Sequence, residues 1–157
     1  MIGTAAEPVT CLYSHDWHTD DNVPWNQTMI TEGMKANGFN AVEFAHAGSF
    51  TFDLRRWPRE IADETTATSA LRTPILDAKS NRPITGVALP IRSARLRIWH
   101  GEKTYVDETQ RLAPDGDGVV FNVASLPAGP AFVQTWFFDA AGHELCGAYY
   151  NYVNAAR

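Results

Sequence analysis

No stretch of this chain is apolar enough to cross a membrane. A spanning helix needs about 20 consecutive apolar residues, and no window of the sequence approaches that length. The first ten residues, MIGTAAEPVT, have neither the basic start nor the apolar run of a signal peptide. The sequence therefore predicts no membrane partner, and the chain as written is expected to stay in the compartment where it is made.

Cysteine is also scarce. Cys11 and Cys146 lie near opposite ends of the chain, and two cysteines without metal-ligand spacing make neither a disulfide framework nor a metal site. The first and last strands of a sandwich are often neighbours, so a single bridge between them is geometrically possible. Two buried free thiols are the simpler interpretation, because a reduced cysteine packs as a small apolar side chain.

Basic residues are fewer than acidic ones, with 13 Lys and Arg against 18 Asp and Glu. The net charge is -5 and the pI is about 5.4, whereas a general nucleic-acid binder needs a basic face to displace counterions from phosphates. Nucleic acid is therefore not an expected partner. The hydrophobic content of 45% is that of a globular chain, and 157 residues are enough for a single domain over residues 1–157.

The apolar residues show almost no helical periodicity. Instead, apolar and polar residues alternate with a period of two. SFTFDLRRW places Phe50, Phe52 and Leu54 on one face, with polar residues between them. NAVEFAHAG and SARLRIWH alternate in the same way. Such alternation is typical of antiparallel strands with one buried face.

Further strands are predicted in PVTCLYS, KTYVDE, GVVFNVASL, AFVQTWFFD and ELCGAYYNYV. NQTMITEGMKAN and EIADETTATSAL are weak helix candidates, and about 61–87 is a long polar excursion. The predicted fold is all-β: an antiparallel β-sandwich, jelly-roll-like, with about eight or nine strands.

Motifs for nucleophilic catalysis are absent. There is no Gly-x-Ser-x-Gly, and Ser14 next to His15 is not a dyad, because neighbours on an extended chain point apart. The segment YSHDWHTDDNVPWNQ, residues 13–27, holds His15, His18 and Asp20, which could bind zinc or calcium as part of a small metal-assisted hydrolase. The two imidazoles lie on opposite sides of an extended chain, so we expect no metal or other cofactor, with this divalent-metal site as the alternative.

Tryptophans in or beside predicted loops indicate a recognition surface instead. An indole stacks on the apolar face of a sugar ring, and a guanidinium binds sulfate or carboxylate through two parallel hydrogen bonds. The candidate ligand-binding residues are Trp17, Trp25, Asn26, Arg55, Arg56 and Trp57. The alternative is that the tryptophans close the ends of the sandwich and the arginines pair with Glu60 or Asp53.

A family resemblance rests on five runs of the sequence: HDWH, VPWNQ, NGFNAVEFAHAGSFTFDLRRWPRE, LPIRSARLRI and TWFFDAAGHELCGAYYNYV. From about Pro8 to Val153 the chain resembles the C-terminal region of bacterial arylsulfatase-type enzymes, where such a segment follows the catalytic domain. The sulfatase nucleophile motif, Cys/Ser-x-Pro-x-Arg, is absent here, so the activity does not carry over. What the resemblance implies is an accessory β-domain from a periplasmic or secreted parent.

Three hypotheses follow. The first is a non-catalytic β-sandwich that contacts carbohydrate, sulfated or anionic, through loop Trp, Arg and His residues. The second is a purely structural domain that packs on a sulfatase catalytic domain. The third is the metal-assisted hydrolase that uses His15, His18 and Asp20.

Overall fold

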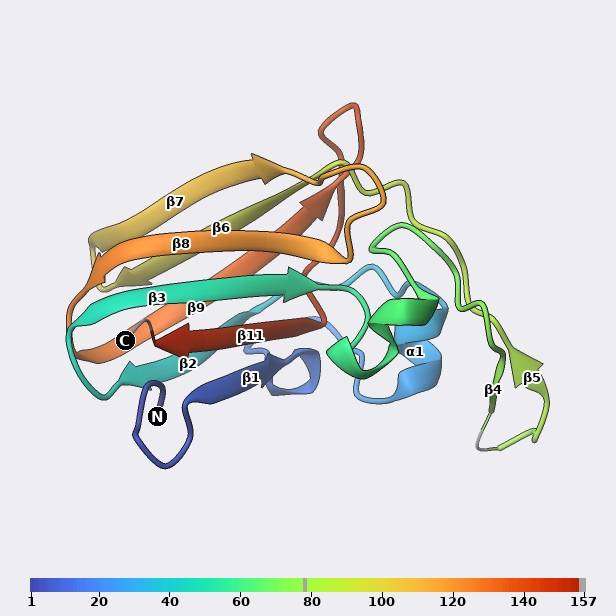
Figure 1. The fold of residues 1–157 in the computed structure, drawn as a ribbon, viewed down its shortest axis with the longest axis horizontal. Helices are drawn as coiled ribbons and strands as arrows, with labels where there is room; N and C mark the ends of the chain where they lie inside the picture. The colour runs from blue at the N-terminus through green and yellow to red at the C-terminus, as the bar shows by residue number, and fades with distance from the viewer. Residues whose placement is uncertain (78, 156–157) are drawn as a thin grey trace.

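Two antiparallel sheets face each other in the computed structural model, which describes residues 1–77 and 79–155 (Figure 1). The first is four-stranded with the order β1-β11-β3-β8. All its neighbours pair antiparallel. Its strands are β1 (Val9–Tyr13), β3 (Gly48–Arg55), β8 (Gly118–Leu126) and β11 (Tyr150–Ala155).

The second sheet is five-stranded, and β9 lies at its centre. On one side β9 pairs with β6, which pairs with β7; on its other side it pairs with both β2 and β10. The strands are β2 (Phe39–Phe44), β6 (Ser93–His100), β7 (Lys103–Arg111), β9 (Gly129–Phe138) and β10 (Glu144–Cys146). The prediction of an all-β antiparallel sandwich is confirmed.

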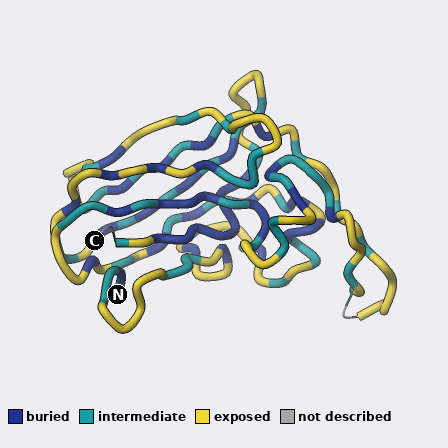
Figure 2. Tube along the Cα trace, in the orientation of Figure 1, coloured by how far each residue is buried: buried dark blue, intermediate teal, exposed yellow. Residues whose placement is uncertain are grey.

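The core is the layer between the sheets. Phe50, Phe52 and Leu54 on β3 are at most 1% exposed, as their alternation predicted. Leu96 and Ile98 on β6 meet them from the other sheet and are also completely buried. Figure 2 shows the buried residues concentrated along the strands and the exposed ones in the connections. Burial of one face per strand therefore holds the two layers together.

One predicted strand is two strands. ELCGAYYNYV forms β10 in the five-stranded sheet and β11 in the four-stranded sheet. Gly147 lies where the chain crosses between them, and its N–H donates to the Ala36 carbonyl. A Cβ on Gly147 would lie 2.7 Å from the Trp17 indole, so the crossing requires a residue without a side chain at this point.

The polar excursion leaves the sandwich after β3. It begins with a 3₁₀ segment, Arg59–Glu64, and its far end is a small hairpin of β4 (Ile75–Leu76) and β5 (Pro83–Ile84). Figure 1 shows this hairpin projecting beside α1 (Gln27–Thr31). A second 3₁₀ turn, Ser14–Asp16, follows β1. Among the described residues no helix has the length and hydropathy needed to span a membrane.

Candidate functional site

Trp17 and Trp57 lie in the core. Trp57 is 2% exposed, and its indole N–H donates to the Ser69 carbonyl at 3.0 Å. Trp17 is 7% exposed and packs on the Tyr149 ring, with 6.3 Å between the ring centroids. The prediction that these two indoles face a ligand from the loops is wrong, because the excursion and the β10–β11 crossing cover them.

Arg56 is also buried. Its guanidinium lies 4.5 Å from the centroid of the Trp57 ring and donates to the carbonyls of Ser69 and Val87. It is 0% exposed, and burial lowers the pKa of the guanidinium. The prediction that Arg56 is a ligand-binding residue is wrong, since both carbonyls belong to the excursion, which folds over the end of β3 and covers the guanidinium.

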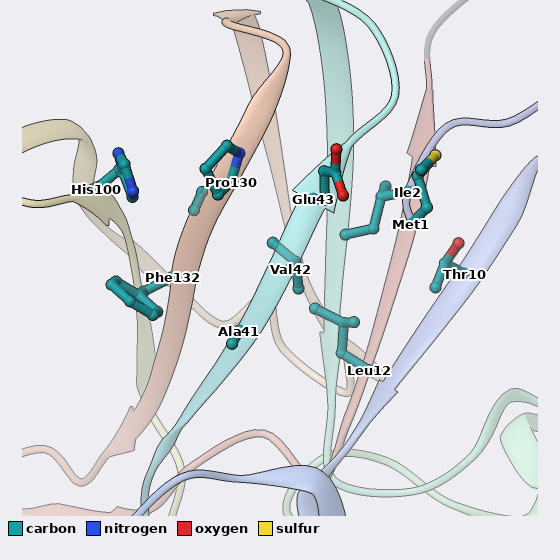
Figure 3. Close-up of a pocket in the computed structure, with 11 residues that line it drawn as sticks. Met1, Ile2, Thr10, Leu12, Ala41, Val42, Glu43, His100, Pro130 and Phe132 are labelled. Carbon is teal, nitrogen blue, oxygen red and sulfur yellow. The ribbon is translucent and has the colours of Figure 1, made fainter.

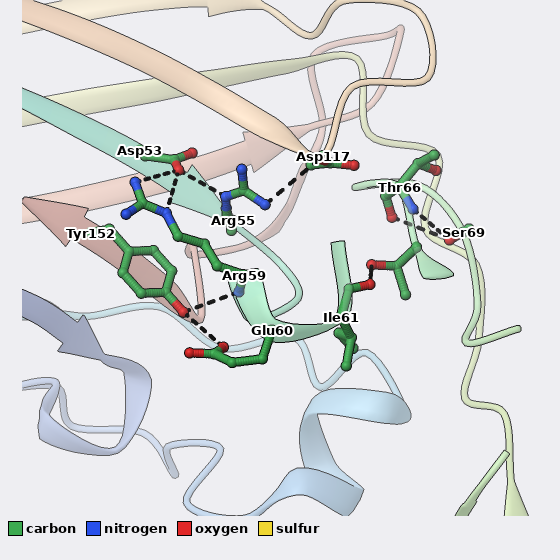
Figure 4. A network of polar contacts seen from close by, with 10 residues as sticks. Asp53, Arg55, Arg59, Glu60, Ile61, Thr66, Ser69, Asp117 and Tyr152 are labelled. Carbon is green, nitrogen blue, oxygen red and sulfur yellow. Dashed lines mark hydrogen bonds and ion pairs between the residues drawn. The ribbon is translucent and has the colours of Figure 1, made fainter. Parts of the chain in front are cut away.

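Arg55 belongs to a network of polar contacts at the same corner (Figure 4). One carboxylate oxygen of Asp53, Oδ2, accepts from Arg55 Nε at 2.8 Å and from Arg59 Nε and Nη2 at 3.0 and 2.8 Å. Arg55 Nη1 also lies 3.8 Å from Asp117. Arg59 covers the Tyr152 ring, with 4.2 Å to the ring centroid. The alternative in which Arg55 pairs with Asp53 is confirmed, so RRWPRE builds a structural corner.

Trp25 is the predicted candidate that reaches the surface. It is 66% exposed. Asn26, the next residue, caps α1: its side-chain oxygen accepts from the Met29 N–H at 3.0 Å. Pro24, on the other side, is buried and its carbonyl accepts from the Ser14 hydroxyl at 2.9 Å. The backbone on both sides of Trp25 is therefore fixed, and its indole projects from a rigid support.

Two hollows flank the Trp25 indole. One, of about 440 Å³, lies between α1 and the β4–β5 hairpin, and its lining includes Met29, Leu76 and Lys79. The other, of about 200 Å³, reaches toward the end of β1, and its lining includes Tyr13 and His15. We call Trp25 with these two hollows the Trp25 surface.

A second aromatic group borders this surface. Tyr13 is 41% exposed and stacks on the His15 imidazole, with 5.7 Å between centroids. The Tyr150 ring meets Tyr13 edge-on at 5.9 Å, and its hydroxyl donates to Gln27 Oε1 at 3.0 Å. Burial raises the pKa of Tyr150 to about 12, so this hydroxyl is a neutral donor at neutral pH.

The alternative metal ligands are not brought together. His15 Nε2 lies 3.1 Å from Asp16 Oδ1, whereas the His18 ring stacks on Phe39 at 5.2 Å. His18 also forms a backbone bridge with Phe39. Within residues 1–77 and 79–155 no group of three or more His, Cys, Asp or Glu side chains could hold a metal ion. Asp20 joins neither histidine in a common site.

The cysteines are separate thiols. Cys11 lies on β1 of the four-stranded sheet and Cys146 on β10 of the five-stranded sheet, and both are free. Burial raises the pKa of each thiol to about 11. The prediction that both thiols are free is confirmed, but only Cys146 is fully buried and Cys11 is half-buried. Both are protonated and weakly nucleophilic at neutral pH.

No protein-family model, no curated protein and no solved structure matches this chain. The resemblance to the sulfatase C-terminal region therefore stays a prediction, and the function is inferred from the surfaces themselves.

A groove of about 460 Å³ also lies between the edges of the two sheets (Figure 3). Leu12 of β1 and Val42 of β2 face each other across it, and Ile2 closes one end through a bridge to Phe44. Sequence reasoning missed this groove, because its two walls come from strands about thirty residues apart that meet only when the sheets stack.

Proposed function

We propose that this chain is a non-catalytic accessory β-sandwich that contacts carbohydrate, sulfated or anionic, through the Trp25 surface. The observation that carries the proposal is the 66% exposure of the Trp25 indole between two hollows. An indole held out of the core by fixed backbone loses little conformational entropy when it stacks on a ligand.

The surroundings of Trp25 match the chemistry of a sugar. Tyr13 and His15 supply further ring surface beside the smaller hollow, and aromatic faces pack on the apolar C–H face of a pyranose. Lys79 lines the larger hollow together with Glu32 and Asp77. Its ammonium is the group there that can pair with a sulfate or carboxylate of an anionic glycan.

Native electrophoresis through gels that contain polysaccharide tests the proposal. We expect the protein to be retarded by a sulfated or anionic polysaccharide, and we expect Trp25→Ala to weaken binding about tenfold, equivalent to ~1.4 kcal/mol. Val120→Ala is the matched control, since Val120 is a 48% exposed apolar residue on β8. Equal retardation of wild type and Trp25→Ala would show that the Trp25 surface does not bind the glycan.

A second function has one observation in its favour. Leu76 is 64% exposed beside Trp25 and lines the same hollow with Ile75 and Met29. Exposed apolar patches often mark protein interfaces, so this surface also suits a structural domain that packs on a sulfatase catalytic domain. Absence of retardation in every gel would favour this second function.

A further inference from the structure

Two side-chain amides follow Trp25 directly on the Trp25 surface. Asn26 and Gln27 line both hollows together with the indole. Asn26 is half-buried and Gln27 is exposed. A ligand that stacks on the Trp25 ring and fills either hollow therefore lies next to both amides.

The Asn26 amide has a fixed orientation. Its Oδ1 accepts from the Met29 N–H at 3.0 Å, which is the cap of α1. A backbone N–H can only donate, so the amide atom that faces it must be the oxygen. The Nδ2 group has no hydrogen-bond acceptor among the described residues, and it therefore remains available as a donor to a ligand.

The Tyr150 hydroxyl orients the Gln27 amide in the same way. Tyr150 is 8% exposed, and its hydroxyl donates to Gln27 Oε1 at 3.0 Å. Burial raises the pKa of Tyr150 to about 12, so the hydroxyl keeps its proton at neutral pH. In the described part of the chain this proton has no other acceptor, so the amide atom that faces it must be the oxygen. Gln27 Nε2 is then the end of the amide that is left for a ligand.

Both amides thus present N–H groups beside the indole. The oxygens of sugar hydroxyls, sulfates and carboxylates all accept hydrogen bonds from such groups. Glu32 and Asp77 line the larger hollow, whereas no described Asp or Glu lines the smaller one. In the smaller hollow a ligand oxygen can therefore contact the amides without a carboxylate beside it. Amides that are oriented before binding also lose less conformational entropy when the ligand binds.

We propose that Asn26 Nδ2 and Gln27 Nε2 donate hydrogen bonds to oxygens of the glycan whose ring stacks on Trp25, and that Tyr150 is a positioning residue for Gln27. A sugar ring held by stacking alone can turn in its own plane on the indole. Two oriented donors beside it fix that rotation and so select one arrangement of ligand oxygens. The inference rests on the proposed function and adds the polar contacts that give the same site its specificity.

Native electrophoresis through gels that contain dextran sulfate, alginate or unsulfated dextran tests the two donors. Gln27→Ala should weaken binding of the polysaccharide that retards the wild type about tenfold. Asn26→Asp keeps an oxygen that caps α1 but loses the donor, and it should weaken binding by a similar factor. Asn122→Ala is the matched control and should bind like the wild type. Asn122 is an exposed amide on β8, at the opposite edge of its sheet from β1.

Tyr150→Phe tests the positioning role. Alone it should weaken binding about threefold, because the Gln27 amide is then free to rotate. In the Gln27→Ala background it should have no further effect, since no amide is left to orient. A merely structural effect of the lost hydroxyl would weaken binding equally in both backgrounds and would overturn the positioning role. Unfolding in urea checks that each variant is folded.

The outcomes separate this inference from the proposed function. Weaker binding in Trp25→Ala, with wild-type binding in Gln27→Ala and Asn26→Asp, would overturn the inference and leave the proposed function standing. Retardation by unsulfated dextran alone, weakened in Gln27→Ala, would support the two donors and overturn the anionic ligand of the proposed function. An equal loss in Gln27→Ala and Asn122→Ala would overturn the inference, and no retardation in any gel would overturn both.

Discussion

A single buried arginine decides how the corner after β3 is built. Arg56 is 0% exposed, has no carboxylate beside it among the described residues, and donates to the carbonyls of Ser69 and Val87. A buried charge is costly unless hydrogen bonds replace its hydration. Here two carbonyls of the excursion supply those bonds, so Arg56 attaches the excursion to the sandwich.

Arg56→Ala should therefore lower the free energy of unfolding by about 2–4 kcal/mol, through the lost hydrogen bonds and the cavity left beside Trp57. Urea denaturation followed by fluorescence measures this change. Arg72→Ala, at an exposed arginine, should change it by less than about 0.5 kcal/mol. Similar values for the two variants would mean that water replaces the guanidinium at both carbonyls.

At the scale of elements, the β4–β5 hairpin is joined to α1 by one carboxylate. Asp77 Oδ2 accepts from the Thr28 hydroxyl at 3.0 Å, and Oδ1 accepts from the N–H and hydroxyl of Ser80, both at 2.7 Å. These hydrogen bonds lower the pKa of Asp77 from 3.8 to about 2. The largest effect comes from the Ser80 N–H, followed by the Ser80 hydroxyl and then the Thr28 hydroxyl. The carboxylate therefore helps to form the larger hollow beside Trp25.

Because the pKa of Asp77 is lower in the folded protein, its carboxylate stabilises the contact between the hairpin and α1 fully above about pH 4. This stabilisation is lost as the pH falls toward 2. We expect the hairpin to separate from α1 over that range, so that the protection of amides around Ile75 and Ile84 against hydrogen exchange, relative to their intrinsic rate at each pH, falls. In Asp77→Asn this protection should already be lower at pH 7 and should not change further over this range. An unchanged pH dependence in Asp77→Asn would assign the effect to other carboxylates.

At the scale of the whole molecule, one core joins both sheets and the loops. Phe52 of β3, Leu96 of β6 and Trp57 at the corner belong to the same buried cluster. A single continuous core gives cooperative unfolding, because no part keeps its buried surface once the sheets separate. The prediction of a single domain over residues 1–157 requires such a shared core.

We therefore expect one transition in urea, with the same midpoint by far-UV circular dichroism and by tryptophan fluorescence. Leu96→Ala should shift both midpoints together and lower the free energy of unfolding by about 2–5 kcal/mol. Two separated transitions, or a shift in one signal alone, would show that the excursion or one sheet unfolds independently.

Local alternation in the sequence predicted the strands well. Phe50, Phe52 and Leu54 are buried as expected, because a period of two directly reports one buried face. Exposure beyond the strands was harder to predict: Trp25 is on the surface, but Trp17, Arg56 and Trp57 are buried. Their burial depends on Gly147 and on the carbonyls of the excursion, which are distant in sequence.

Residue types and short spacings were enough to predict the all-β class, the inward faces of the strands and the absence of a sulfatase nucleophile motif. Which aromatic and charged residues contact solvent depends instead on how the strands and loops pack together. The alignment of Phe39, Gln134, Arg97 and Asp107 exists only through pairing between β2, β9, β6 and β7. Strand pairing and sheet stacking join residues far apart in the chain, and local patterns carry no information about those contacts.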